Sequence, residues 1–193
     1  MSWFIDTKRL FGLSNSGEIV RRYFVVNGFD GALTMLGLMV GFLFSAPGDL
    51  TVVINVCSAA AIALGMSGLS SAYLSESAER QHALSKLEDA MIRDLQDSAH
   101  GKAAKLTPML VAAVNGLAPL LISLLILSPL WLSSAGVWLP LPAIICAIII
   151  AMLLIFLLGV FLGRIAGISW LRSGIETLLL AAVTATLIYC FTG

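Results

Sequence analysis

The chain has 193 residues, of which 59% are hydrophobic and only 11% are charged, and its mean hydropathy is +1.00. Because soluble domains carry about 25% charged residues, this composition excludes a soluble globular protein and predicts that lipid covers most of the surface. The formal net charge is zero, so the total charge indicates no partner such as a nucleic acid, and only the distribution of the charges is informative.

The chain begins with a polar and basic segment, residues 1–22, that lacks the apolar core of a cleavable signal peptide. Farther along, several runs meet the requirement of about 20 mostly apolar residues for one crossing of the bilayer. These runs are residues 23–45, 50–75, 107–128, 138–162 and 170–191. They predict an all-α membrane protein with five transmembrane helices, two in residues 23–75 and three in residues 107–193, separated by a polar insert over residues 76–106.

Lysine and arginine are confined to alternate connections between the predicted spans. They lie before the first span, between the second and third, and between the fourth and fifth: Lys8, Arg9, Arg21, Arg22, Arg80, Lys86, Arg93, Lys102, Lys105, Arg164 and Arg172. The other two loops and the C-terminus contain none. Under the positive-inside rule, this asymmetry predicts a cytoplasmic N-terminus, a cytoplasmic insert and, after an odd number of spans, a C-terminus outside.

The insert is expected to be an amphipathic helix that continues the second span, because neither Gly nor Pro occurs between Ser70 and Ala99. Gly101 is the expected stop of this helix. An apolar stripe at helical spacing comprises Leu84, Leu87, Met91 and Leu95. The opposite face carries charges in steps of three or four: Glu79, His82, Lys86, Asp89, Arg93, Asp97 and His100.

Two interpretations of the insert remain open. It is either a solvated helix packed on its neighbours, stabilised by pairs of opposite charge one turn apart, or a cytoplasmic surface that collects cations. In the second interpretation Glu76, Glu79 and His82 form the most compact group, at the exit from the membrane. Carboxylate and imidazole ligands suit Mn²⁺ and Fe²⁺, and the interleaved Lys and Arg predict weak binding.

Asp30 is the outstanding ionisable residue at membrane depth. It follows Tyr23 by seven residues, which places it roughly 10 Å inside the cytoplasmic boundary at about 1.5 Å per residue. No basic residue lies near it in the same span, whereas Asn27 and Thr34 share its helical face. Because a charged side chain inside the bilayer is costly, it is a functional hypothesis by default, and this carboxylate can alternate between a cation and a proton.

Other polar groups are expected at a similar depth. In the third span Pro119 cannot donate a hydrogen bond to the carbonyl of Asn115, so position 115 offers a side-chain amide and a freed backbone oxygen. In the second span Ser70 adds a hydroxyl and Met66 a thioether near the same level. The alternative for Asn115 and Ser70 is hydrogen bonding between helices, and Glu176 in the fifth span can pair with Arg172.

Two stretches of the chain resemble the vacuolar iron transporter family. The opening of the first span, Arg22 to Ala32 (RYFVVNGFDGA), resembles that family's Asn-Asp-Gly element. The end of the second span, Gly65 to Arg80, resembles the Gly-Glu-Tyr-x-Ser element and the charged helix after it. The order of two spans, a cytoplasmic helical insert and three further spans also fits, so the resemblance covers most of the chain from about residue 20.

The resemblance implies a five-span homodimer that exports Fe²⁺ or Mn²⁺ from the cytosol in exchange for protons, with no permanently bound cofactor. The family's first-span aspartate transfers to Asp30. Its second-span glutamate does not transfer, since Ala72 occupies that position, and Glu76, one turn closer to the cytoplasm, is the expected substitute in proton coupling. The departures indicate a divergent branch in the plasma membrane of a prokaryote.

The sequence therefore predicts a divalent-metal/proton antiporter, with ligands drawn from Asp30, Glu76, Glu79, His82, Asn115, Ser70 and Met66. Two other classes remain open. One is a channel or carrier for another small solute, and the other is a non-transporting membrane scaffold that binds a partner through the cytoplasmic helix. An enzyme is not expected, because neither a metalloprotease motif nor a nucleophile motif is present.

Overall fold

The fold consists of long helices and short connections. The computed structural model describes residues 16–45 and 48–192. The helices are α2 (Ser16–Ser45), α3 (Leu50–Met91), α4 (Ala99–Ser134), α5 (Ala143–Ala166) and α6 (Trp170–Thr192). Each of these five contains a stretch long and apolar enough to cross a membrane, which confirms the predicted all-α class and the five predicted spans.

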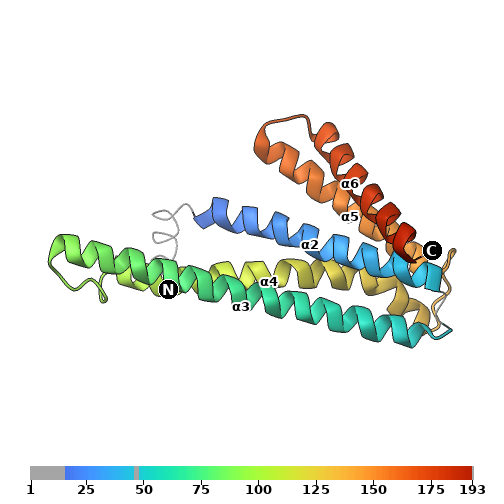
Figure 1. The fold of residues 1–193 in the computed structure, drawn as a ribbon, viewed down its shortest axis with the longest axis horizontal. Helices are drawn as coiled ribbons and strands as arrows, with labels where there is room; N and C mark the ends of the chain where they lie inside the picture. The colour runs from blue at the N-terminus through green and yellow to red at the C-terminus, as the bar shows by residue number, and fades with distance from the viewer. Residues whose placement is uncertain (1–15, 46–47, 193) are drawn as a thin grey trace.

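The helices pack as two antiparallel hairpins with α2 between them (Figure 1). Helices α3 and α4 lie side by side along most of their length, and α2 packs mainly on α4. The second hairpin, α5–α6, contacts α2 toward one end of the bundle and diverges from it toward the α5–α6 turn (Figure 1). Fully buried Met35, Met39, Cys57, Ile126 and Ile155 form part of the core where these helices meet.

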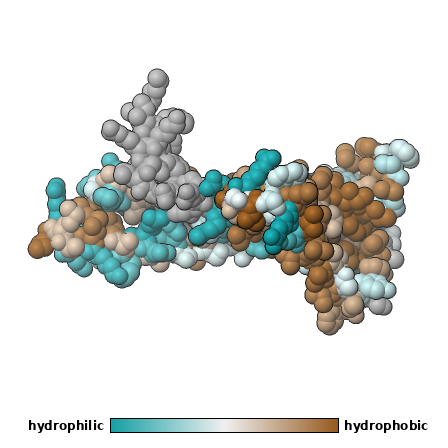
Figure 2. Space-filling model, turned by 90° about the horizontal axis from the view of Figure 1, so that it is seen from above, coloured by the Kyte–Doolittle hydropathy of each residue, from teal (hydrophilic) through white to brown (hydrophobic). Residues whose placement is uncertain are grey.

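Helix α3 is too long to lie wholly in a bilayer. Its 42 residues extend about 60 Å at 1.5 Å per residue, twice the roughly 30 Å of bilayer hydrocarbon. The α3–α4 hairpin projects beyond the other helices (Figure 1). Hydrophilic residues are concentrated along its projecting part, with some apolar residues at the tip, whereas apolar residues cover most of the opposite end (Figure 2). This arrangement confirms that the second span continues into the charged helix.

The insert is a helical hairpin, so the prediction of one helix ending at Gly101 was wrong. Helix α3 ends at Met91, and Ile92 adopts the left-handed conformation with φ 51°. The chain then folds back because the Glu88 carboxylate accepts a hydrogen bond from the Leu95 backbone N–H (2.9 Å) and the Leu95 side chain is buried. Gly101 instead lies in the first turn of α4.

Two other boundaries differ from the prediction. The third span, expected over residues 107–128, lies inside the longer α4, which begins at Ala99 and continues through Pro129 to Ser134. The fourth was expected from residue 138, but α5 begins at Ala143 because Pro142 precedes it as the N-cap residue. Proline fixes φ and has no N–H, so it suits a helix start better than an interior.

Candidate functional site

Two asparagines join three helices. The Asn27 amide of α2 donates to the Asn115 side-chain oxygen of α4. The Asn115 amide in turn donates to the Gly68 carbonyl of α3 (2.7 Å). We call these three residues the asparagine junction. The junction confirms that Asn27 and Asn115 lie at the same level, which counting along two separate spans had only suggested.

Glycines bring the backbones together around the asparagine junction. A Cβ atom added at Gly68 would lie 2.6 Å from the Asn115 carbonyl oxygen, and one added at Gly31 would lie 2.7 Å from the Pro119 carbonyl oxygen. Real Cβ atoms do not approach backbone oxygens this closely. The Asn115 carbonyl, which Pro119 leaves without its usual donor, thus lies against the α3 backbone at Gly68.

Asp30 lies one turn beyond Asn27 on α2, and its side chain is exposed. Among the described residues, no hydrogen bond or ion pair engages the Asp30 carboxylate. Gly37 lies two turns farther on the same face of α2 and contacts Ile188 of α6, to which an added Cβ would be 3.0 Å distant. Helix α6 therefore covers this face of α2 at Gly37. Toward the α5–α6 turn, α6 diverges from α2 (Figure 1).

The predicted metal ligands Glu76, Glu79 and His82 of α3 do not form a metal-binding cluster with Asp30. Within residues 16–45 and 48–192, no group of three or more His, Cys, Asp or Glu could hold a metal ion. The Glu76 carboxylate accepts from Arg80 (2.8 Å), whereas Glu79 and His82 are exposed. Their role as ligands therefore stays a prediction.

The remaining polar candidates bond within their own helices. The Ser70 hydroxyl donates to the Met66 backbone carbonyl (2.7 Å), and both side chains are exposed. In α6, Glu176 accepts from Arg172 (2.9 Å) and this ion pair is open to the surroundings, as expected for the alternative in which Glu176 pairs with Arg172. Asp30 differs from Glu176 in lacking such a partner among the described residues.

Ala72 occupies the position where the resemblance would place a glutamate, and it is buried in an apolar contact. It is buried with Val111 and Ala112 of α4, and Tyr23 of α2 packs on the same cluster. A glutamate at position 72 would have to enter this apolar contact. Ala72 lies one turn beyond Gly68, so this apolar cluster borders the asparagine junction. The sequence places Asn27 on the same helical face as Asp30 but does not reveal its bond to Asn115, because no pattern within one helix records which helix lies opposite.

Comparison with known proteins finds a relative in the archaeon Methanocaldococcus jannaschii. It is "Uncharacterized protein MJ0645", which is 30% identical over 179 residues, covering 91% of this chain and 89% of the relative. The chain belongs to the same family as this archaeal protein. No family model matches the chain, and no solved structure does so.

Proposed function

We propose that this family member is a transporter that exports Fe²⁺ or Mn²⁺ from the cytosol in exchange for protons. The observation that carries the proposal is the exposed Asp30 carboxylate in an apolar span. A charged carboxylate cannot face lipid hydrocarbon at low cost, so water, a cation, a proton or another protein surface must meet it. The resemblance to vacuolar iron transporters supports a metal cation and a proton as its alternating partners.

We propose further that two copies of the chain meet at this face of α2. A second copy would shield the exposed carboxylate from lipid and place two Asp30 side chains about one axis, because a two-fold interface uses the same surface on both partners. The path for the cation would then run between the two copies.

The proposed orientation has the α3–α4 hairpin in the cytoplasm and the C-terminus outside, in the plasma membrane of a prokaryote. In a cysteine-free background, a cysteine at Ile92, which is 94% exposed at the hairpin tip, should react with a membrane-impermeant maleimide only after the cells are opened. A cysteine at Val137, in the connection between α4 and α5, should react in intact cells. The opposite pattern would reverse the orientation and with it the direction of export.

The transport proposal is tested in proteoliposomes that carry a pH gradient. In liposomes that contain the purified protein, Mn²⁺ or Fe²⁺ should move in the direction opposite to the proton flow. A protonophore that collapses the pH gradient should stop this metal flux. Protein-free liposomes measure the passive leak of metal. Excess K⁺ or Mg²⁺ tests for a channel or carrier of another solute, because its metal flux would be inhibited by these ions or would not depend on the pH gradient. Absence of gradient-driven metal flux would contradict the proposal.

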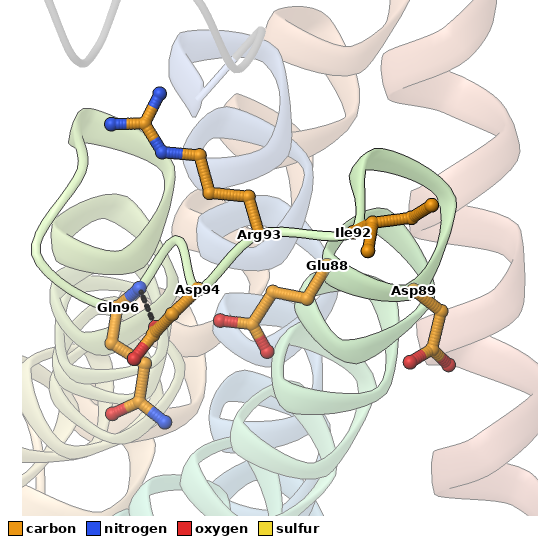
Figure 3. A pocket seen from close by; sticks show the side chains of 6 residues that line it. All are labelled: Glu88, Asp89, Ile92, Arg93, Asp94 and Gln96. Carbon is orange, nitrogen blue, oxygen red and sulfur yellow. Dashed lines mark hydrogen bonds between the residues drawn. The ribbon is translucent and has the colours of Figure 1, made fainter.

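A specific feature of the hairpin favours a second candidate, a scaffold that binds a soluble partner. Beside the exposed Ile92, a hollow of about 450 Å³ is lined by Glu88, Asp89, Arg93, Asp94 and Gln96 (Figure 3). A soluble partner would pair with the charged groups of this hollow and cover the exposed side chains of Ile92 and Met91. A scaffold does not need Asp30, so replacement of Asp30 separates the two candidates.

A further inference from the structure

We infer that the side-chain oxygen of Asn27 is a cation ligand beside Asp30, and that Asn115 is the residue that positions it. This inference rests on the proposed transport of a divalent cation and names a ligand for it. It starts from the hydrogen bonds of the asparagine junction, in which the Asn27 amide nitrogen has two acceptors. They are the Tyr23 backbone carbonyl (2.8 Å) and the Asn115 side-chain oxygen.

The orientation of both amides is fixed by the groups at the two ends of the junction. The Tyr23 and Gly68 carbonyls can only accept hydrogen bonds. Asn115 must therefore turn its nitrogen toward Gly68 and its oxygen toward Asn27, and Asn27 must turn its nitrogen toward both Tyr23 and Asn115. A flip of either amide would place two acceptors against each other, so the network admits one assignment.

This arrangement leaves Asn27 with its oxygen as the group open to a ligand. A side-chain amide has two N–H donors, and both are used within the protein. Asn27 is half-buried and Asp30 is exposed, and residues three apart lie on the same side of a helix. One amide oxygen and one carboxylate therefore face the same surroundings on α2.

The chemistry of this pair favours a divalent cation over an anion or an organic solute. Carboxylate and amide oxygens are the ligands that Mg²⁺, Ca²⁺ and Mn²⁺ prefer, whereas an anion would need the N–H groups that Asn27 has already committed. Two oxygens do not complete a coordination sphere, so water and the second copy of the chain must supply the rest. Asn115 touches no cation in this arrangement and acts through Asn27.

The inference is tested by infrared difference spectroscopy of the whole protein in nanodiscs, with ¹³C-labelled asparagine and Mn²⁺ as the probe. The chain has four asparagines, at positions 15, 27, 55 and 115. Addition of Mn²⁺ should shift one labelled amide C=O band to lower frequency, because a cation withdraws electron density from the oxygen. The shift should disappear in Asn27→Ala and persist in Asn55→Ala, a matched control at an exposed position of α3.

Transport kinetics give the readout for Asn115. Asn115→Leu removes the acceptor of Asn27 and should raise the KM for Mn²⁺ by about 10–100-fold, the usual loss when a group that orients a ligand is removed, with a much smaller change in kcat. The labelled band should then respond to Mn²⁺ only at correspondingly higher concentration. A fall in kcat with unchanged KM would overturn the positioning role.

Failure of this inference is distinct from failure of the proposed function. Gradient-driven Mn²⁺ flux without any shift of an asparagine band, or with a shift that survives Asn27→Ala, would overturn Asn27 as a ligand and leave transport standing. Absence of flux from the wild-type protein would overturn the proposed function itself. Comparing the thermal unfolding of the Asn27→Ala and Asn55→Ala proteins shows whether the variants remain folded.

Discussion

Replacing Asp30 by asparagine is expected to abolish proton-driven metal flux. The substitution keeps the size of the side chain but removes both the negative charge that binds a cation and the group that exchanges a proton. Flux should fall by about 100-fold or more, since loss of even an outer group of a metal site costs about 10–100-fold. The measurement is initial Mn²⁺ flux in proteoliposomes at a fixed pH gradient.

The fold should tolerate this change, because the Asp30 side chain is exposed and makes no hydrogen bond or ion pair among the described residues. Glu176→Gln provides the matched control: it also removes a carboxylate from a span, but one that pairs with Arg172 outside the proposed path. Full flux from Asp30→Asn would refute the assignment of Asp30, and partner binding that persists in this variant would favour the scaffold.

The five helices within residues 16–45 and 48–192 were predictable because each span must satisfy its backbone hydrogen bonds alone in lipid, so each long apolar run forms one helix. The turn at Ile92 was not. Residues 92–98 contain no Gly or Pro, and the turn depends on Glu88 bonding the Leu95 N–H (2.9 Å). This bond requires the chain to have already folded back, so it leaves no periodic signal in the sequence.

The candidate site was predictable in part. The isolated acid and the proline after Asn115 mark Asp30 and Asn115 within their own helices. Which residue each one meets depends on helix rotation and register, which are set by close contacts between α2, α3 and α4. The bond between Asn27 and Asn115 and the burial of Ala72 against α4 follow from that register, and no single helix encodes it.

The glycine pattern shows the same limit. Gly159 and Gly163 lie one turn apart in the sequence, a spacing that permits close helix packing but does not identify the partner helix. In the structure they contact α6: an added Cβ at Gly159 would lie 2.2 Å from the Thr177 hydroxyl oxygen, and one at Gly163 would lie 2.7 Å from the Ser173 Cβ. These glycines therefore join α5 to α6 within one chain, and they need not be part of a contact between two copies.

Gly31→Ala is expected to destabilise the protein strongly, because its new Cβ would lie 2.7 Å from the Pro119 carbonyl oxygen and 2.8 Å from the Pro119 Cα. Both atoms belong to a helix backbone, which cannot yield as the end of a flexible side chain can. Overpacking of this kind costs about 1–3 kcal/mol, and each kcal/mol lowers Tm by about 2–4 °C in a chain of this size. The measurement is thermal unfolding in detergent.

Gly41→Ala is the matched control on the same helix, since no atom lies within 4 Å of a Cβ added there. Alanine is the better helix former by about 1 kcal/mol, so this variant should unfold at the same or a higher temperature. Helix propensity favours alanine at both positions. Of these two positions, only Gly31 lies where the close approach of α2 to α4 excludes a Cβ atom, so the pair of variants separates the two effects. If both variants unfolded at the wild-type temperature, α2 and α4 would not cross this closely, and the register that aligns Asn27 with Asn115 would be wrong.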